Sequence, residues 1–351
     1  MTDAAPIADC GAPWLSVCIP TYNFAAYIGE TLASIARQDL SGVEVVILDG
    51  GSTDDTSTVV EGFRSVIPRL IYVRREARGG IDRDIELAIS HAAGEYAWTF
   101  SADDIMVDGA VRRLAAKVGH GDDVILCETV LCGIAMDHPH AYPNSRERRE
   151  TVFQLADADE RGRYLRLAAN TQALFSFCGA LVFKRQRWLA SPYDGFFIGS
   201  CWSHVSRLLA LIPGGLRVRL VPEVWSRKRG DNDSFAERGI LNRVRIGIEG
   251  YLGIAERHFG AAGPEYREVM RLLRAEYTLR CLLAQKVLMH LTGRAEDIPG
   301  LILLARRIRS EPTLSNLYAR ACLRIAPVGL LVPLRRMAWW LRGRRPRKAG
   351  R

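Results

Sequence analysis

Short apolar runs alternate with amphipathic segments through residues 14–104, and this alternation constrains the fold more than any other feature of the sequence. Four of the apolar runs are predicted to be buried strands, at 14–20, 43–48, 70–73 and 96–100. Helices are predicted between them, beginning near residues 28, 56 and 81. Strands and helices that alternate at such short intervals are typical of an α/β domain built on a mostly parallel, doubly wound sheet.

The predicted strands are followed by polar loops that carry Gly or Asp. The carboxyl ends of parallel strands meet at one edge of the sheet, where open α/β sheets bind their ligands. Asp49 ends the second strand, and the glycines at 50 and 51 allow a ligand to approach the backbone closely. The double glycine at 79–80 suits a phosphate or ribose and is equally typical of a tight turn. Together these loops favour a nucleotide site.

Asp103 and Asp104 lie at the tip of the fourth predicted strand. Two carboxylates there suit a hard divalent cation beside a diphosphate, because such a cation keeps several waters and needs only one or two protein carboxylates. The alternative is an ordinary helix start, in which Asp104 caps a helix over 107–118. The neighbouring loops favour the metal site.

Length and composition allow a large folded protein. A chain of 351 residues can form one α/β domain and an additional module, and 48% hydrophobic residues can fill a core. The eight cysteines lack the spacing of a zinc site, so we expect reduced thiols in a cytoplasmic protein. Residues 1–13 lack the basic start and apolar core of a signal peptide, and no apolar run is long enough to span a membrane.

The net charge of +9 is concentrated at the carboxyl end. Eight Lys or Arg residues between 335 and 351 interleave with apolar side chains that include Trp339 and Trp340. This composition is typical of a helix lying on anionic lipid, although nucleic acid or solvent could also accommodate the charges. The tryptophans favour the membrane. We therefore predict that residues 326–351 form a basic amphipathic tail at the inner face of the cell membrane, with no nucleic-acid partner.

Four motifs occur in order along the first part of the chain: Ile-Pro-Thr-Tyr-Asn at 19–23, Leu-Asp-Gly-Gly-Ser-Thr-Asp-Asp-Thr at 48–56, Gly-Gly-Ile-Asp at 79–82 and Ser-Ala-Asp-Asp at 101–104. With them, residues 14–225 resemble glycosyltransferase family 2, which has the GT-A fold. The Gly-Ile-Asp run and the segment Gly-Ser-Cys-Trp-Ser-His-Val at 199–205 look most like the abequosyltransferase branch, which builds O-antigen side chains. The resemblance implies a nucleotide diphosphate sugar donor, a hydroxyl acceptor and Mg²⁺ or Mn²⁺.

By this resemblance the nucleotide-sugar contacts are Pro20, Tyr22, Asp49, Gly51, Asp82 and Asp103, and the metal ligands are Asp104 and Asp103. Pro20 and Tyr22 would flank the base, Asp49 would contact the base or ribose, and Asp82 the nucleoside, with Asp84 close enough to compete. Asp104 is expected to be the better metal ligand. Ser101 stands where the family often carries an acid, which removes one potential ligand.

The catalytic base has two candidates. Inverting members of the family commonly place a carboxylate near residue 200, where the nearest carboxylate is Asp194 and the matched segment offers His204. A histidine can accept a hydroxyl proton near neutral pH, so we favour His204 as base or acceptor contact and keep Asp194 as the rival. A purely structural role, in which His204 packs under a helix, is the alternative.

A basic segment at 225–235 follows a strand predicted at 216–221. It is predicted to be a lid loop that contacts the diphosphate, through Arg229 before Arg227, because Arg can bind phosphate bidentately. An exposed basic turn is the alternative. From residue 226 to 325 the apolar spacing predicts a helical module that shapes the acceptor side.

The sequence therefore predicts an N-terminal extension (1–13), a GT-A glycosyltransferase domain (14–225), a helical module (226–325) and the basic tail (326–351). We expect transfer of a sugar to a saccharide acceptor that is lipid-linked. One alternative is a degenerate domain that binds a nucleotide sugar or a partner without turnover, because Ser101 replaces an acid. A nucleotidyltransferase is the other, but the Gly-rich Lys or Arg signature of that class is missing near the amino terminus.

Overall fold

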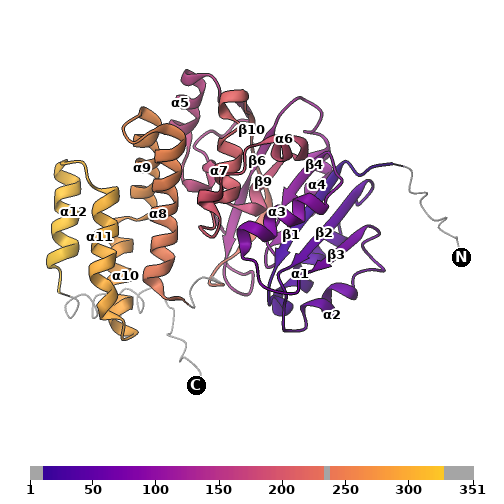
Figure 1. Ribbon diagram of the computed structural model, residues 1–351, viewed down its shortest axis with the longest axis horizontal. Coiled ribbons are helices and arrows are strands. Elements are labelled where there is room, and N and C mark those ends of the chain that lie inside the picture. The colour runs from indigo at the N-terminus through magenta and orange to yellow at the C-terminus, as the bar shows by residue number, and fades with distance from the viewer. Residues whose placement is uncertain (1–10, 233–237, 328–351) are drawn as a thin grey trace, which may run out of the picture. The chain divides into compact units, whose positions relative to one another are not determined.

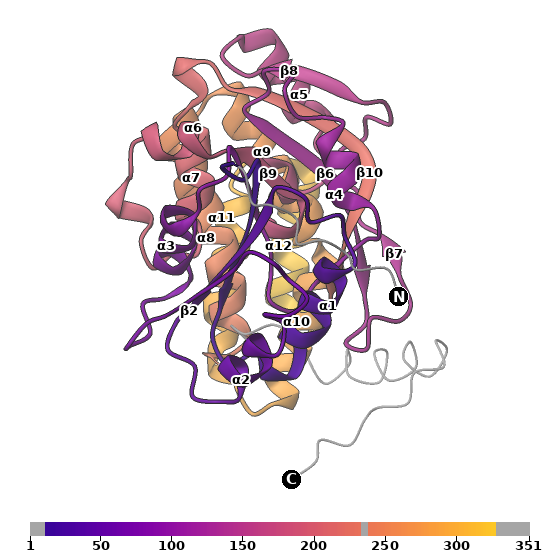
Figure 2. The ribbon, with the colours of Figure 1, turned by 90° about the vertical axis from the view of Figure 1, so that its right-hand side faces the viewer.

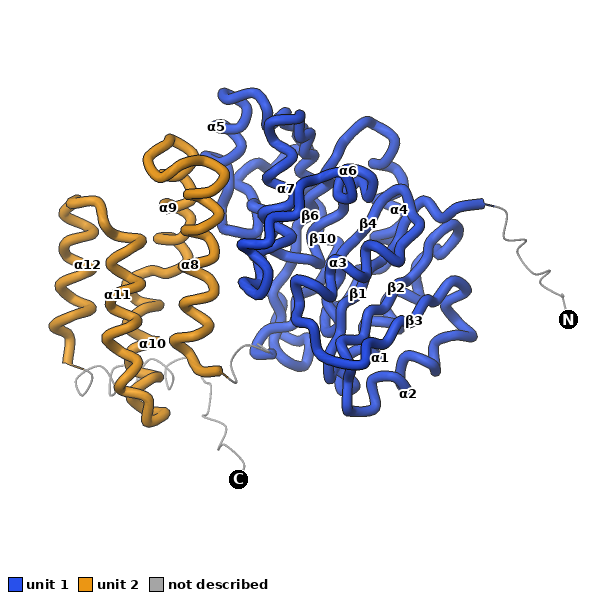
Figure 3. The backbone as a smooth tube through the Cα atoms, viewed as in Figure 1, with its two compact units in different colours: residues 1–232 blue, residues 233–351 orange. Residues whose placement is uncertain are grey.

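The computed structural model describes residues 11–232 and 238–327, and the chain divides into two compact units, 1–232 and 233–351 (Figure 3). The boundary follows Asn232, whereas the sequence analysis placed it after residue 225. The difference arises because a long strand, β10 (Arg217–Arg229), keeps the basic segment in the first unit.

The first unit is built on a mixed, mostly parallel sheet in the order β3-β2-β1-β4-β9-β6-β10-β5. Strands β1 to β4 run parallel, β9 is antiparallel to both its neighbours, and β10 is parallel to β6. This is the mostly parallel α/β sheet that the sequence predicted. The strands on this path are β1 (Leu15–Thr21), β2 (Val43–Asp49), β3 (Leu70–Arg74), β4 (Tyr96–Thr99), β5 (Ile105–Met106), β6 (Val124–Cys132), β9 (Leu181–Lys184) and β10, with β7 (His140–Ala141) beside β6 and β8 (Thr151–Gln154) beside β10.

Helices cover both faces of this sheet (Figures 1 and 2). The chain moves outward from β1 through β2 to β3, then crosses back through α3 (Ile81–His91) to β4 on the other side of β1. Because such crossovers are right-handed, this reversal places α3 on the face opposite α1 (Ala25–Ala36). The reversal between β1 and β4 is a topological switch point, where α/β sheets bind ligands. The remaining helices of this unit are α2 (Thr56–Glu61), α4 (Ala110–Ala115), α5 (Ala158–Leu167), α6 (Arg185–Ala190) and α7 (Ser203–Leu209).

The core of the sheet is filled by strands that are apolar on both faces. Every residue of β1 and β2 is buried, as expected for parallel strands that carry helices on both sides. Trp98 of β4 packs against Trp225 of β10 with ring centroids 5.9 Å apart and against Phe100 at the same distance. These aromatic contacts fix the end of β4 against β10, although β9 and β6 lie between the two strands in the sheet.

Three local predictions were wrong. β1 does not stop at Pro20, because the missing N–H of this residue points toward β4, whose pairing with β1 ends at Cys18 and Thr99. The helix expected over 107–118 is only α4, since residues 105–106 pair with β10 and Gly109 adopts φ +76° just before the helix. The predicted lid loop is strand as far as Arg229, because the segment pairs with β6 and β5.

The second unit is helical, as the sequence predicted. Its helices are α8 (Ile240–Phe259), α9 (Pro264–Glu276), α10 (Leu279–Leu291), α11 (Ile298–Ile308) and α12 (Leu314–Ile325). The apolar faces expected on the first two are buried, including Val244 and Ile248 on α8 and Leu272 and Leu273 on α9. Within the described ranges, no helix has the length and apolar character needed to cross a bilayer. The predicted tail lies outside the described residues from 328 onward.

Candidate active site

The loops after β1 and β2 are joined by hydrogen bonds. The backbone N–H of Asn23 donates to Ser52 Oγ (2.8 Å), and that of Thr53 donates to Asn23 Oδ1 (2.8 Å). Phe24 and Ala25 donate their backbone N–H groups to side chains of the same loop, Thr56 and Asp54. These bonds satisfy backbone groups at the start of α1 that a helix cannot pair internally. The two loops therefore form one structure at the carboxyl edge of the sheet.

Asp49 orders the second of these loops. Its Oδ1 accepts the backbone N–H groups of Gly51 (3.0 Å) and Ser52 (2.7 Å), and its Oδ2 accepts the hydroxyl of Tyr72 (2.5 Å). Gly51 has φ +90°, and a Cβ there would come within 3.3 Å of the carbonyl oxygen of Arg75. The loop therefore needs glycine at this position. Asp49 is fully buried, so it lies at the predicted place but already has three partners.

Tyr22 follows β1 and is half-buried under the side chain of Arg78, whose guanidinium lies 4.3 Å from the ring centroid. Pro20 is buried within β1, two residues before Tyr22. Arg78 comes from the loop after β3, so the pair spans two of the loops at the ligand edge. A guanidinium over an aromatic face at this distance is a cation–π contact.

Asp82 connects the two segments that resemble the abequosyltransferase branch. Its Oδ2 accepts the backbone N–H groups of Gly199 (2.8 Å) and Cys201 (2.9 Å), and its Oδ1 accepts that of Ser203 (3.1 Å). The carboxylate thus fixes residues 199–203 and the start of α7, more than a hundred residues away in sequence. Asp84, two residues further along α3, pairs with Arg75 instead (2.9 Å).

His204 lies near the start of α7 and is only 4% exposed. Its ring stacks on that of Trp202, and neither nitrogen makes a well-formed hydrogen bond among the described residues. Burial lowers the pKa of His204, against opposing effects from the charge of Asp82 and the backbone of Ser176. The imidazole is therefore held neutral. The rival base, Asp194, is half-buried and its Oδ1 accepts the backbone N–H of Phe196 (3.0 Å).

Asp103 and Asp104 lie in the turn after β4, where the sequence predicted a metal site. Asp104 Oδ1 accepts the backbone N–H of Arg229 (2.8 Å), whereas its Oδ2 is buried and makes no well-formed hydrogen bond in the part of the chain that the structure describes. The Ser101 side chain also interacts with this carboxylate and lowers its pKa. Asp103 Oδ2 accepts the side-chain amide of Asn232 (2.8 Å). Burial and the charge of Asp103 raise the pKa of Asp104 to about 7, and burial also raises the pKa of Asp103.

A buried carboxylate oxygen without a well-formed hydrogen bond is unusual and suggests a missing cation or donor. The residues fit a hard divalent cation that takes two carboxylates and completes its shell with water and diphosphate oxygens. No group of three His, Cys, Asp or Glu suited to a metal occurs among residues 11–232 and 238–327, so a cage made only of such side chains is not formed there.

Arg229 positions this acidic turn. Its Nε donates to the carbonyl oxygen of Asp103 (2.8 Å), Nη1 donates to that of Ile134 (2.5 Å), and Nη2 pairs with Glu30 (2.8 Å). Its guanidinium also lies 4.9 Å from the ring centroid of Tyr27. The side chain is 1% exposed and each of its nitrogens already has an acceptor. This arrangement leaves little of the guanidinium for the diphosphate contact that the sequence analysis assigned to it.

Lys228 points to the other face of β10, because side chains alternate along a strand. Its Nζ lies 4.6 Å from the ring centroid of Phe177. Its positive charge lowers the pKa values of both Asp103 and Asp104, opposing the effect of burial. Lys228 is half-buried and Arg227 is exposed, so Lys228 joins Arg229 among the basic residues of this strand whose charge acts on the acidic turn. Sequence alone does not identify Lys228, because the alternation of side-chain directions applies only once the segment is known to be a strand.

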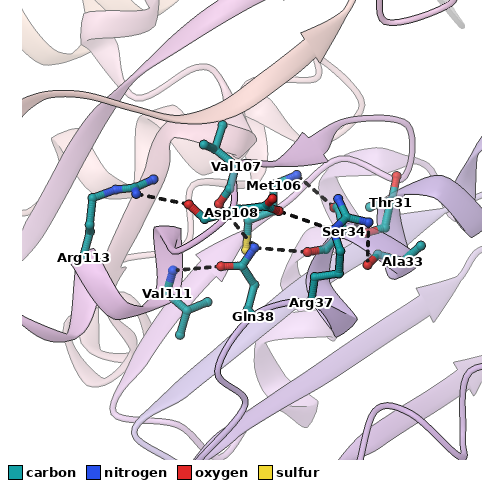
Figure 4. Close-up of polar contacts among 10 residues, drawn as sticks. All are labelled: Thr31, Ala33, Ser34, Arg37, Gln38, Met106, Val107, Asp108, Val111 and Arg113. Carbon is teal, nitrogen blue, oxygen red and sulfur yellow. Dashed lines mark hydrogen bonds and ion pairs between the residues drawn. The ribbon is translucent and has the colours of Figure 1, made fainter.

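Ser34 of α1 and Gln38, two residues beyond the end of that helix, hydrogen-bond to the segment that follows the acidic turn (Figure 4). Ser34 Oγ accepts the backbone N–H of Met106 (2.9 Å). Gln38 Nε2 donates to the carbonyl oxygen of Val107 (3.2 Å), and Gln38 Oε1 accepts the backbone N–H of Val111 (3.5 Å). Both side chains are buried. The only sequence signal for these contacts is that the two polar residues are four positions apart, beside the apolar face of a predicted helix.

Comparison with known proteins agrees with this geometry. The sequence model described as "Glycosyl transferase family 2" matches residues 16–178. The chain is also 30% identical over 249 residues to abequosyltransferase RfbV of Salmonella typhimurium, a match that covers 69% of this chain and 74% of that protein. The chain belongs to glycosyltransferase family 2. The predicted family and enzyme class are thereby confirmed, and a nucleotidyltransferase is excluded.

Solved structures resemble this family 2 glycosyltransferase in fold. S. aureus TarS 1-349 in complex with UDP-GlcNAc superposes with a TM-score of 0.58 at 19% identity, covering 88% of this chain and 87% of that one. Mannosyltransferase PcManGT from Pyrobaculum calidifontis, in complex with GDP-Man and Mn²⁺, gives a TM-score of 0.51 at 22% identity, covering 93% and 81%. Family 2 glycosyltransferases bind nucleotide sugar donors and saccharide acceptors, and divalent metals are typical of the GT-A fold.

Proposed function

We propose that this glycosyltransferase moves a hexosyl or deoxyhexosyl group from a nucleotide diphosphate sugar to a hydroxyl of a lipid-linked saccharide, in the assembly of an O-antigen or related polysaccharide. The observation that carries the proposal is the buried Oδ2 of Asp104, which makes no well-formed hydrogen bond among the described residues. It lies at the carboxyl edge of the sheet, beside the switch point between β1 and β4. The likeness to abequosyltransferase RfbV supports the O-antigen context.

In the proposed mechanism, the donor diphosphate lies against the acidic turn. A Mg²⁺ or Mn²⁺ held by Asp104 and Asp103 would supply neutralisation of the charge that develops on the leaving diphosphate. We assign the protein's own cationic contact to Lys228, because its charge acts on both acids. Arg229 keeps the acids in place from the opposite face of the strand. Tyr22 would contact the base, and Arg78 would move aside or stack on it.

The acceptor hydroxyl needs a proton acceptor. His204 is the candidate that we favour, because burial keeps its imidazole neutral and therefore able to take a proton. Asp82 would be a positioning residue, because it holds residues 199–203, the segment that directly precedes His204. Asp194 remains the alternative base.

Calorimetry with a series of nucleotide diphosphate sugars, with Mn²⁺ present or chelated, tests the proposal on the wild type and on Asp104→Asn. The asparagine keeps an oxygen that can accept the Arg229 N–H, so the fold should survive. We expect metal-dependent binding of one donor and its loss in the variant. A transfer assay with that donor then separates an enzyme from a degenerate binding domain. Absence of donor binding with every metal would contradict the proposed function.

The membrane association predicted from residues 326–351 remains a prediction, because nearly all of that segment lies outside the described residues. A peripheral position at the inner face of the cell membrane would bring the enzyme to a lipid-linked acceptor. A test of the lipid-linked acceptor should therefore also involve residues that the structure describes.

A further inference from the structure

Helix α12 exposes a stripe of large apolar side chains. Leu314 is 87% exposed, Leu317 46%, Tyr318 67% and Ile325 75%, and exposed Ala321 lies between the last two. Their spacing of three or four residues places them on one face of the helix. Isolated exposed apolar residues are ordinary on a protein surface, but an apolar stripe along a whole helix marks an interaction site.

The other side of α12 is well anchored. Ala319 and Leu323 are buried, and the helix contacts α10 and α11. Thr313 caps its amino end by accepting the backbone N–H of Asn316 (3.2 Å). At its carboxyl end, Lys286 of α10 donates to the carbonyl oxygens of Leu323 (2.9 Å) and Ala326 (2.8 Å). The helix is therefore held in place with its apolar stripe facing outward.

The sequence of α12 and of the residues that follow it is basic and contains no acidic residue. From Pro312 to the end, the sequence contains ten Lys or Arg residues and neither Asp nor Glu, so these residues carry more positive charge than the whole chain, whose net charge is +9. Arg320 and Arg324 belong to α12 itself, and Arg324 is exposed. An apolar face on a helix without acidic residues, within a strongly basic region, matches a surface that is apolar below and anionic at its boundary.

We propose that α12 lies in the interface of an anionic lipid bilayer, with its apolar stripe inserted at the level of the headgroups. This inference rests on the proposed function, in which the acceptor is lipid-linked, and it identifies the contacting surface within the described residues. Anionic lipid neutralises the basic charge. A second copy of this chain would instead bring two basic regions together, which like-charge repulsion opposes.

Co-sedimentation of the full chain with vesicles tests the proposal. The vesicles are an equal mixture of phosphatidylglycerol and phosphatidylcholine, with pure phosphatidylcholine as the neutral comparison. The variant combines Leu314→Ser, Leu317→Ser and Ile325→Ser, and the matched control is Val66→Ser, which alters an apolar residue of the first unit that is 52% exposed. The thermal unfolding midpoint verifies that each variant is folded.

We expect wild type and control to bind the anionic vesicles, and the triple variant to bind at least about tenfold more weakly. Donor binding by calorimetry should be the same in all three proteins, so a failure of this proposal is distinguishable from a failure of the proposed function. Unchanged vesicle binding in the folded triple variant would overturn the proposal. A self-association that only the triple variant loses, with vesicle binding intact, would assign the stripe to a second copy and overturn it equally.

Discussion

The backbone N–H of Arg229 donates to Oδ1 of Asp104 over 2.8 Å, although 125 residues separate the two in sequence. The same residue donates its Nε to the carbonyl oxygen of Asp103. Strand β10 therefore holds the acidic turn that follows β4, and it leaves the second oxygen of Asp104 available to a cation. The residue predicted to bind the diphosphate therefore holds the two acids that we propose as metal ligands.

Replacing Arg229 with Met should destabilise the protein. The change leaves the carbonyl oxygens of Asp103 and Ile134 without their donors, which we expect to cost about 2 kcal/mol of the free energy of unfolding. Urea denaturation of the metal-free protein measures this loss in the free energy of unfolding. Arg227→Met is the matched control on the same strand, and its exposed side chain should change stability by less than about 0.5 kcal/mol. Equal losses in the two variants would contradict a specific role for Arg229.

Replacing Lys228 with Met should weaken donor binding without a comparable loss of stability. Its ammonium group lies over the ring of Phe177 and its charge acts on Asp103 and Asp104, so we propose that it contacts the diphosphate. Removing one charge-assisted contact should lower donor affinity roughly tenfold, and Lys228→Arg should retain most of the binding. Calorimetry with the donor and Mn²⁺ measures both. Normal donor binding by Lys228→Met would contradict the proposed contact between Lys228 and the diphosphate.

Two roles for Asp82 can be distinguished by experiment: positioning residues 199–203 beside His204, or contacting the nucleoside directly. Asp82→Asn keeps one acceptor oxygen but loses part of the bonding to the N–H groups of residues 199–203. If Asp82 positions His204, the rate of transfer should fall while the KM for the donor stays nearly constant. If it contacts the nucleoside, as the family resemblance implied, the KM for the donor should rise. Asp84→Asn, two residues further along α3, serves as the control.

The early part of the fold was predictable because its strands are short, apolar and separated by loops with a clear composition. β2, β3 and α3 depend mainly on local patterns, and their predicted positions agree closely with the structure. The position of Asp49, Asp103 and Asp104 at one sheet edge followed from parallel strands alone.

The misplaced features depend on contacts between distant segments. The basic run at 227–229 is polar, so its pattern indicated a loop, but pairing with β6 and β5 makes it a strand. That pairing also determines to which face of β10 each basic side chain points. In the same way, nothing local shows that Asp82 accepts hydrogen bonds from residues 199–203. The family resemblance linked these two segments by their sequence motifs alone, and it predicted no contact between them.

The neutral state of His204 predicts a specific dependence of stability on pH. Burial holds its pKa in the folded state below the ordinary value of 6.5. As the pH falls below about 6.5, the unfolded chain therefore binds a proton at this position that the folded chain does not. The free energy of unfolding should fall by up to about 1.4 kcal/mol per pH unit from this one group, until the pH reaches the folded pKa.

His204→Gln should remove this part of the dependence and leave the rest. Urea denaturation of both proteins between pH 7.5 and pH 5.5, which spans the ordinary histidine pKa of about 6.5, isolates the contribution as the difference between the two slopes. We expect the slopes to agree above that pKa and to diverge below it, by at most one proton. Parallel slopes would mean that His204 takes up its proton in the folded protein. Its imidazole would then be charged under mildly acidic conditions, and the proposed role as a neutral base would be restricted to higher pH.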